Sequence, residues 1–130
     1  MAKVNKNIQF SELSNRVIGC AIDVHKSLGP GLLESAYQQC LCHEFRLNNI
    51  KFEREKPLAV NYKGFHLDCG YRIDIVVENQ IIIELKAIDL IKPIHEAQII
   101  SYMKLSGLRQ GFLINFNVPI LKDGLSSFVI

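Results

Sequence analysis

Two acids and a lysine on neighbouring apolar segments are the residues of this chain best suited to chemistry. Asp74 lies in the run 71–78, and Glu84 and Lys86 lie in the next run, 81–87. Because strand side chains alternate, Glu84 and Lys86 leave one face of the second strand and the apolar residues beside them leave the other. The sequence therefore predicts a polar cluster on one face of a hairpin.

The turn between these two strands decides whether Asp74 joins the cluster. With a three-residue loop at 78–80, the register places Asp74 opposite Glu84 and Arg72 opposite Lys86. Two carboxylates directly opposed across a ladder repel each other. A cation between them would offset that repulsion, so this register indicates a metal site.

The predicted cluster suits phosphodiester hydrolysis. Hard divalent cations such as Mg²⁺ prefer oxygen ligands, often one or two carboxylates with waters and substrate phosphate. Such a metal acidifies a bound water and neutralises charge in the transition state. A lysine two residues after a ligand carboxylate, as Lys86 is after Glu84, reaches the same water or the scissile phosphate and lowers the barrier electrostatically.

Two helical segments could add polar groups to this site. Gln98 and Tyr102 lie four residues apart and therefore share a helix face, from which they could orient the lysine, a carboxylate or the substrate. His95 shares that face, whereas the other three histidines show no paired metal spacing and are interpreted as structural or surface residues. Glu34 and Tyr37 lie three residues apart on an earlier helix.

Simpler interpretations remain open for each residue. A Glu-x-Lys pair on a strand is common and usually forms a weak solvated ion pair. Asp74 could equally form a surface bridge with Arg72 or Lys86. Glu34 is favoured near a helix N-terminus by the helix dipole whatever else it does, and Tyr37, on the apolar face of its helix, most simply packs. The joint arrangement, rather than any one residue, favours a site.

The elements that must position these residues follow from apolar periodicity and turn signals. Helices are expected at 11–27, 32–47 and 93–106, and strands at 50–54, 58–62, 65–77, 81–87, 110–116 and 125–130. Ser11 is a plausible N-cap, and Leu33 and Cys40 are expected on the apolar face of the second helix. A strand-helix-strand crossover is normally parallel, so 110–116 should pair with 81–87. The predicted fold is α/β, with helices flanking a central mixed sheet made of an antiparallel meander and a parallel crossover strand.

Bulk composition places few limits on function. A chain of 130 residues with 48% hydrophobic and 22% charged residues is expected to form one globular domain, 1–130. It has neither a membrane-spanning apolar run nor a signal core, so a cytoplasmic protein is expected. The net charge of +2 permits a nucleic-acid partner without arguing for one. The four cysteines lack zinc or redox spacing and are interpreted as free thiols.

Three motifs resemble a known family. Asp74, followed after a hairpin by Glu84-Leu85-Lys86, resembles the PD-(D/E)xK nuclease motif, with Ile73 where proline often stands. Gln98-x-x-x-Tyr102 is similar to the extra motif of the exonuclease-like branch of that superfamily. The segment 31–37, Gly-Leu-Leu-Glu-Ser-Ala-Tyr, matches the signature of the GxxExxY proteins, small prokaryotic members of largely unassigned function. The resemblance covers nearly the whole chain.

This resemblance implies a restriction-endonuclease-like core and a set of roles. Asp74 and Glu84 would bind Mg²⁺ or Mn²⁺, and Lys86 would be the catalytic lysine. The Leu85 carbonyl would complete the metal shell, and Glu34 would be the helical acid that supports it. The positions implied as accessory or substrate-binding are Gln98, Tyr102, Tyr37 and Arg72.

One departure from the family pattern lies near the end of the chain. Members often carry a basic residue after the Asp-Gly turn, where this chain reads Leu125-Ser126-Ser127 after Asp123-Gly124. A phosphate contact is then missing, and an apolar terminal strand remains. An uncovered strand edge invites pairing, so a homodimer is expected to be possible.

Three hypotheses follow. The first is a Mg²⁺- or Mn²⁺-dependent nuclease acting on nucleic acid, with DNA favoured over RNA. The alternative is a non-catalytic nucleic-acid-binding or assembly module built on a nuclease fold, which would bind with salt sensitivity but without turnover. The third is hydrolysis of a small phosphate ester or nucleotide.

Overall fold

The computed structural model describes residues 3–4, 11–67 and 69–130. The helices are α1 (Glu12–Leu28), α2 (Glu34–Leu47) and α3 (Pro93–Ser106), with a 3₁₀ helix, η1, at Leu121–Gly124. The strands are β1 (Lys3–Val4), β2 (Phe52–Pro57), β3 (Val60–Tyr62), β4 (Phe65–Leu67), β5 (Arg72–Val77), β6 (Ile81–Lys86), β7 (Gln110–Asn115) and β8 (Leu125–Val129).

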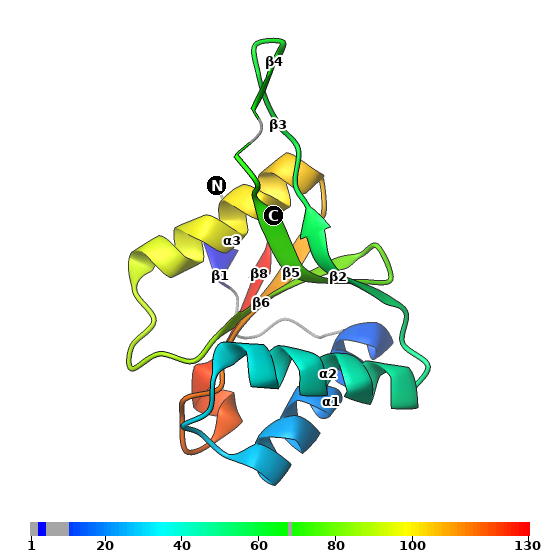
Figure 1. The fold of residues 1–130 in the computed structure, drawn as a ribbon, viewed down its shortest axis with the longest axis vertical. Helices are drawn as coiled ribbons and strands as arrows, with labels where there is room; N and C mark the ends of the chain where they lie inside the picture. The colour runs from blue at the N-terminus through cyan, green and yellow to red at the C-terminus, as the bar shows by residue number, and fades with distance from the viewer. Residues whose placement is uncertain (1–2, 5–10, 68) are drawn as a thin grey trace.

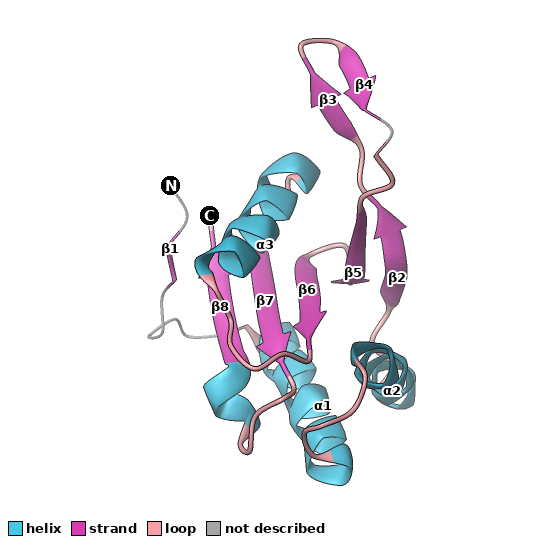
Figure 2. Cartoon of the chain, turned by 60° about the vertical axis from the view of Figure 1, so that its left-hand side comes forward, coloured by secondary structure: helices cyan, strands magenta, loops and turns pink. Residues whose placement is uncertain are grey.

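A mixed sheet forms the centre of the molecule. Among the described residues, six strands pair in the order β1-β8-β7-β6-β5-β2, with β6 and β7 parallel and the other neighbours antiparallel. Helices α1 and α2 cover one face and α3 covers the other (Figures 1 and 2). The predicted α/β class and the parallel crossover are confirmed, and the architecture is consistent with a restriction-endonuclease-like fold.

Helix starts follow local signals, with one correction. The Ser11 side chain accepts a hydrogen bond from the Ser14 N–H at 3.2 Å, which confirms the N-cap of α1. Helix α2 begins at Glu34, two residues later than predicted, because Gly31 has a φ of 98° and Leu33 remains extended. Leu33 is consequently 77% exposed and does not belong to the apolar face.

The predicted continuous meander is wrong in one region. Strands β3 and β4 form a separate two-stranded hairpin that projects from the body, so β2 pairs directly with β5 (Figure 1). The single strand expected at 65–77 is split into β4 and β5. Gly70, with a φ of 70°, lies in the split, and this left-handed conformation turns the chain out of the strand.

Two hydrophobic clusters hold the helices on the sheet. The alternation along β6 sends Ile83 and Leu85 towards α1 and α2, while Ile82 packs towards α3. The predicted split of side chains along this strand is confirmed. On α2 the buried thiol is Cys42, whereas Cys40 is only half-buried, and the cysteines of the described residues are free.

The terminal strand differs from its predicted state. β1 pairs antiparallel with β8, with Lys3 opposite Val129 and Val4 opposite Phe128. This part of the edge is therefore covered, and the predicted uncovered edge, which motivated a homodimer, is wrong there. No helix in the described part of the chain is long and apolar enough to cross a membrane.

Candidate metal and catalytic site

The β5–β6 hairpin has the register that the sequence predicts. Val77 pairs with Ile81 and Ile75 pairs with Ile83, so one further step places Asp74 beside Glu84. Regular pairing of the two strands ends before that step. Instead, the Asp74 carboxylate turns to β6, where its Oδ2 accepts the Leu85 N–H at 2.8 Å. Asp74 is thereby held against the strand that carries Glu84.

Glu84 is a buried acid without a full set of partners. Its side chain is 4% exposed, and its Oε1 is buried with no hydrogen-bond partner among the described residues. Burial, a hydrogen bond with the Asp74 side chain and the negative charge of Asp74 raise the pKa of Glu84 to about 10. Without a cation, the pair therefore holds a proton, and Oε1 remains an unused acceptor.

A chain of hydrogen bonds connects Lys86 to helix α3. The Lys86 ammonium donates to Gln98 Oε1 at 3.4 Å, and Gln98 Nε2 donates to the Tyr102 hydroxyl at 3.2 Å. Burial raises the pKa of Tyr102, so the phenol stays neutral. The sequence prediction that this helical pair could orient the lysine agrees with the contacts.

Helix α2 brings one further acid towards the pair. Glu34 is exposed at the first position of α2, yet partial burial and the negative charge of Asp74 raise the pKa of Glu34, with Lys86 opposing the shift. An electrostatic influence of this kind means that Glu34 lies near both residues. The structure thus brings Asp74, Glu84 and Lys86 together from two strands. Glu34 of α2 lies within range of the Asp74 and Lys86 charges, but it forms no three-acid metal group with Asp74 and Glu84 in the described part of the chain.

Tyr37 lies in the core rather than at a substrate surface. It is 0% exposed and stacks on Phe116 with ring centroids 4.5 Å apart. Its hydroxyl donates to the Gly29 carbonyl at 2.5 Å and accepts the Leu32 N–H at 3.1 Å. Tyr37 therefore fixes the loop that leads to Glu34, and the implied contact with substrate is not available to it.

Replacing Tyr37 with phenylalanine is expected to lower the free energy of unfolding by about 1–3 kcal/mol, because the Gly29 carbonyl and Leu32 N–H lose a partner. Urea unfolding of both chains measures the change. The exposed Tyr62, changed to phenylalanine, is the matched control and should leave stability unaltered. Equal stability of Tyr37→Phe and the wild type would contradict this structural role.

Arg72 and His95 occupy the margins of the site. Arg72 is exposed and donates to the Glu55 carbonyl at 3.4 Å, and the β5–β6 ladder ends before it could pair Arg72 with Lys86. His95 accepts the Lys92 N–H on its Nδ1 at 2.9 Å and so caps α3. It also lines a hollow of about 430 Å³ together with Lys86 and Gln98, which keeps it beside the lysine.

Gln38 is a residue that sequence reasoning missed. It is buried, and its Nε2 donates to the Asp74 carbonyl at 3.3 Å and to Glu55 Oε1 at 3.2 Å. The β2–β5 ladder skips the Glu55–Asp74 pair, where Glu55 has a φ of 52°, so the Asp74 carbonyl has the Gln38 amide as a partner. The available signal was the spacing, since Gln38 lies one helical turn after Glu34.

The ligands available for a metal are few. Across the described residues, no three His, Cys, Asp or Glu side chains form a metal-binding group. The Leu85 side chain is buried, so only its backbone could take part, and its N–H already binds Asp74. Mg²⁺ usually keeps several waters and binds one or two carboxylates, which matches a site built from Asp74 and Glu84 better than a closed cage would.

Comparison with known protein families identifies the chain. The family model described as the PD-(D/E)XK nuclease superfamily matches residues 11–128. The chain belongs to this superfamily. Its members are generally phosphodiesterases or nucleases with nucleic-acid substrates, and they typically use divalent metals such as Mg²⁺. No curated protein and no solved structure matches the chain. Membership of the GxxExxY branch stays a prediction from the motif at 31–37.

Proposed function

We propose that this chain is a Mg²⁺- or Mn²⁺-dependent nuclease that acts on DNA, with RNA as the second choice of substrate. The observation that carries the proposal is the buried Oε1 of Glu84, which has no hydrogen-bond partner among the residues that the structure describes and lies beside Asp74, with Lys86 on the same strand face. A buried carboxylate oxygen without a partner is costly. A bound metal cation is the partner that best suits this carboxylate oxygen.

The residues present fit such a cation. Asp74 and Glu84 would hold it, with the Leu85 carbonyl and Glu34 in supporting roles, and the positive charge would remove the repulsion between the two acids. When bound, the cation supplies charge neutralisation on the phosphate and a more acidic water. The carboxylates would then be ionised.

Other side chains of this protein would stabilise the phosphate and position the catalytic groups. Lys86 carries a positive charge that stabilises the developing negative charge of the phosphate. Gln98 accepts one hydrogen bond from the Lys86 ammonium and so limits the orientations of the lysine side chain. Asp74 keeps its position through the Leu85 N–H and the Gln38 amide. These contacts support a preorganised site rather than a solvated ion pair.

The test is cleavage of labelled single- and double-stranded DNA and RNA in Mg²⁺ or Mn²⁺. We expect cleavage by the wild type and none by Glu84→Ala, because the latter loses the buried ligand oxygen. Asp23→Ala, an exposed change on α1, is the control and should cleave normally. Absence of any metal-dependent cleavage, or cleavage that survives in Glu84→Ala, would overturn the proposal. Salt-sensitive binding without turnover would instead favour the non-catalytic module.

Metal binding can be measured before a substrate is known. At a Mn²⁺ concentration of about 100 times its dissociation constant, the fold should gain about 2.7 kcal/mol of stability, which a melting scan detects. Asp74→Ala and Glu84→Ala should lose this gain, whereas Asp23→Ala should keep it. An equal shift in all four proteins would show that the metal binds elsewhere.

A further inference from the structure

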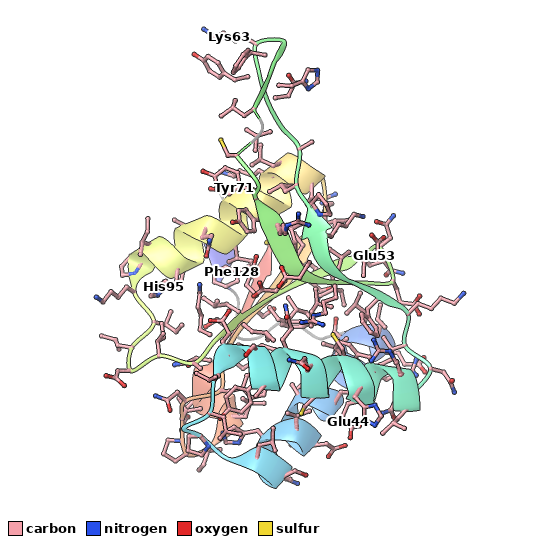
Figure 3. All side chains as sticks on the ribbon, in the orientation of Figure 1. Glu44, Glu53, Lys63, Tyr71, His95 and Phe128 are labelled. Atoms are coloured by element: carbon pink, nitrogen blue, oxygen red, sulfur yellow. The ribbon has the colours of Figure 1, made fainter. Side chains whose placement is uncertain are left out.

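The exposed aromatic side chains gather on one part of the molecule. Tyr62, Phe65 and Tyr71 are 62%, 67% and 46% exposed, and no other described tyrosine or phenylalanine is exposed. Tyr62 and Phe65 belong to the projecting hairpin β3–β4, here called the finger (residues 60–67), and Tyr71 lies at its base. Figure 3 shows Lys63 at the tip of the finger and Tyr71 beside α3. Clustered exposed apolar groups mark an interaction surface.

The finger has one apolar face. Tyr62 pairs with Phe65 and Val60 pairs with Leu67, so these four side chains share a face, while Asn61 and His66 lie on the other. Lys63 and Gly64 form the two-residue turn, with φ values of 48° and 81°. Positive φ at both turn residues is typical of a type I′ hairpin. The local turn residues therefore favour the hairpin conformation of the finger, and its aromatic rings do not pack in the hydrophobic core.

Contacts connect the base of the finger to the proposed site. The Tyr71 ring meets the Tyr102 ring edge-on at 6.3 Å, and Tyr102 bonds Gln98, which holds Lys86. Phe65 and Tyr71 are six positions apart in the sequence, a length of chain that spans at most about 20 Å. A strand of nucleic acid that passes Lys86 would therefore reach the finger within a few nucleotides.

Charge favours nucleic acid as the occupant of this surface. The finger itself, residues 60–67, contains one lysine, Lys63, and no acid, and the nearest acids in the sequence on either side are Glu55 and Asp68. Lys56 pairs with Glu53, whereas the Lys63 ammonium lies 5.3 Å from the centre of the Tyr62 ring, at the tip. This arrangement suits single-stranded nucleic acid, in which the lysine would contact a phosphate while the exposed rings stack on unpaired bases. Stacking does not depend on sequence, because every base has a π-face.

We propose that the finger is a base-stacking platform for a single-stranded segment of the substrate, next to the phosphodiester that is cleaved. Tyr62 and Phe65 stack on the bases and Lys63 contacts a phosphate. The inference rests on the proposed nuclease function for the identity of the substrate. It predicts that single strands, frayed ends or flaps bind better than intact duplex.

The experiment measures binding apart from cleavage. Fluorescence anisotropy in EDTA gives the dissociation constants of labelled dT20, its RNA counterpart and a 20-base-pair duplex. These oligonucleotides are longer than the roughly 4–16 nucleotides that one single-strand-binding domain typically covers. We expect Tyr62→Ala/Phe65→Ala to bind both single strands about 10- to 100-fold more weakly than the wild type. The duplex should be affected less. Leu47→Ala/Ile120→Ala removes two similarly exposed side chains elsewhere and should bind as the wild type does.

Two further variants separate stacking from other causes. Tyr62→Leu/Phe65→Leu keeps apolar bulk without π-faces and should bind as weakly as the alanine variant, and Tyr62→Phe should bind normally. Lys63→Ala should weaken binding to all sequences. It should also reduce the slope of log binding constant against log salt concentration by about 1, the value expected for the loss of one phosphate contact. Circular dichroism and melting scans confirm that each variant folds.

Several outcomes overturn the inference. They are unchanged binding by the alanine variant, full rescue by the leucine variant, absence of oligonucleotide binding by the wild type, and a finger-dependent self-association that replaces binding. The proposed function fails separately. If the wild type binds through the finger but never cleaves, the nuclease proposal falls and the platform stands; if it cleaves and the finger variants bind normally, the reverse holds.

Discussion

Replacing Lys86 with methionine is expected to slow metal-dependent cleavage by about 10²- to 10³-fold, the loss typical when one preorganised stabilising group is removed. Methionine keeps much of the apolar stem while it removes the charge that Gln98 positions at 3.4 Å. Single-turnover cleavage at saturating Mn²⁺ measures the effect on the chemical step. Lys104→Met, an exposed change on α3, is the matched control and should retain full activity.

The same variant separates catalysis from metal binding. Because Lys86 is a cation, its removal should not abolish the Mn²⁺-dependent rise in melting temperature that Asp74 and Glu84 provide. A Lys86→Met protein that binds metal but cleaves slowly would support the proposed role. Cleavage at the wild-type rate would remove Lys86 from the mechanism, and loss of the metal effect would assign it a structural role instead.

Glu84→Gln is expected to stabilise the metal-free protein at pH 8. Burial and Asp74 raise the pKa of Glu84 from 4.5 to about 10 in the folded state. The unfolded chain therefore ionises first as pH rises above 4.5, and the free energy of unfolding of the wild type falls across this range. Glutamine has no proton to lose, so the variant should exceed the wild type by about 1–3 kcal/mol at pH 8.

Urea unfolding in EDTA at pH 5 and pH 8 tests this pH dependence. The advantage of Glu84→Gln should fall below about 1 kcal/mol at pH 5, because this pH lies close to the unfolded pKa of 4.5 and the unfolded wild type gains little free energy there by ionising. Added Mn²⁺ should reverse the order at pH 8, because the amide is a poorer ligand than a carboxylate. Glu53→Gln, changed on an exposed side chain, should show no such dependence. A pH-independent advantage would contradict the burial argument.

Local sequence signals predicted much of the fold. Ser11 predicted the start of α1, Pro93 the start of α3, and the three residues 78–80 the register that pairs Val77 with Ile81. Each of these depends on neighbours in the chain, namely a cap, a fixed φ or a turn length. The polar cluster of Asp74, Glu84 and Lys86 followed from that register, because strand side chains alternate.

Tertiary structure determined the contacts between residues that are far apart in the sequence, which local patterns do not predict. Gln38, 36 residues from Asp74, meets its carbonyl only because α2 packs on the sheet where the β2–β5 ladder is interrupted. Helical spacing favoured packing for Tyr37 and the family resemblance implied an accessory role, and the tertiary structure decided between them by placing the ring against Phe116. The pairing of β2 with β5 separated the finger from the sheet, and β1 covered part of the β8 edge. The residues proposed for the chemistry were thus predictable from sequence, whereas the contacts that hold them depend on long-range packing, which no local pattern encodes.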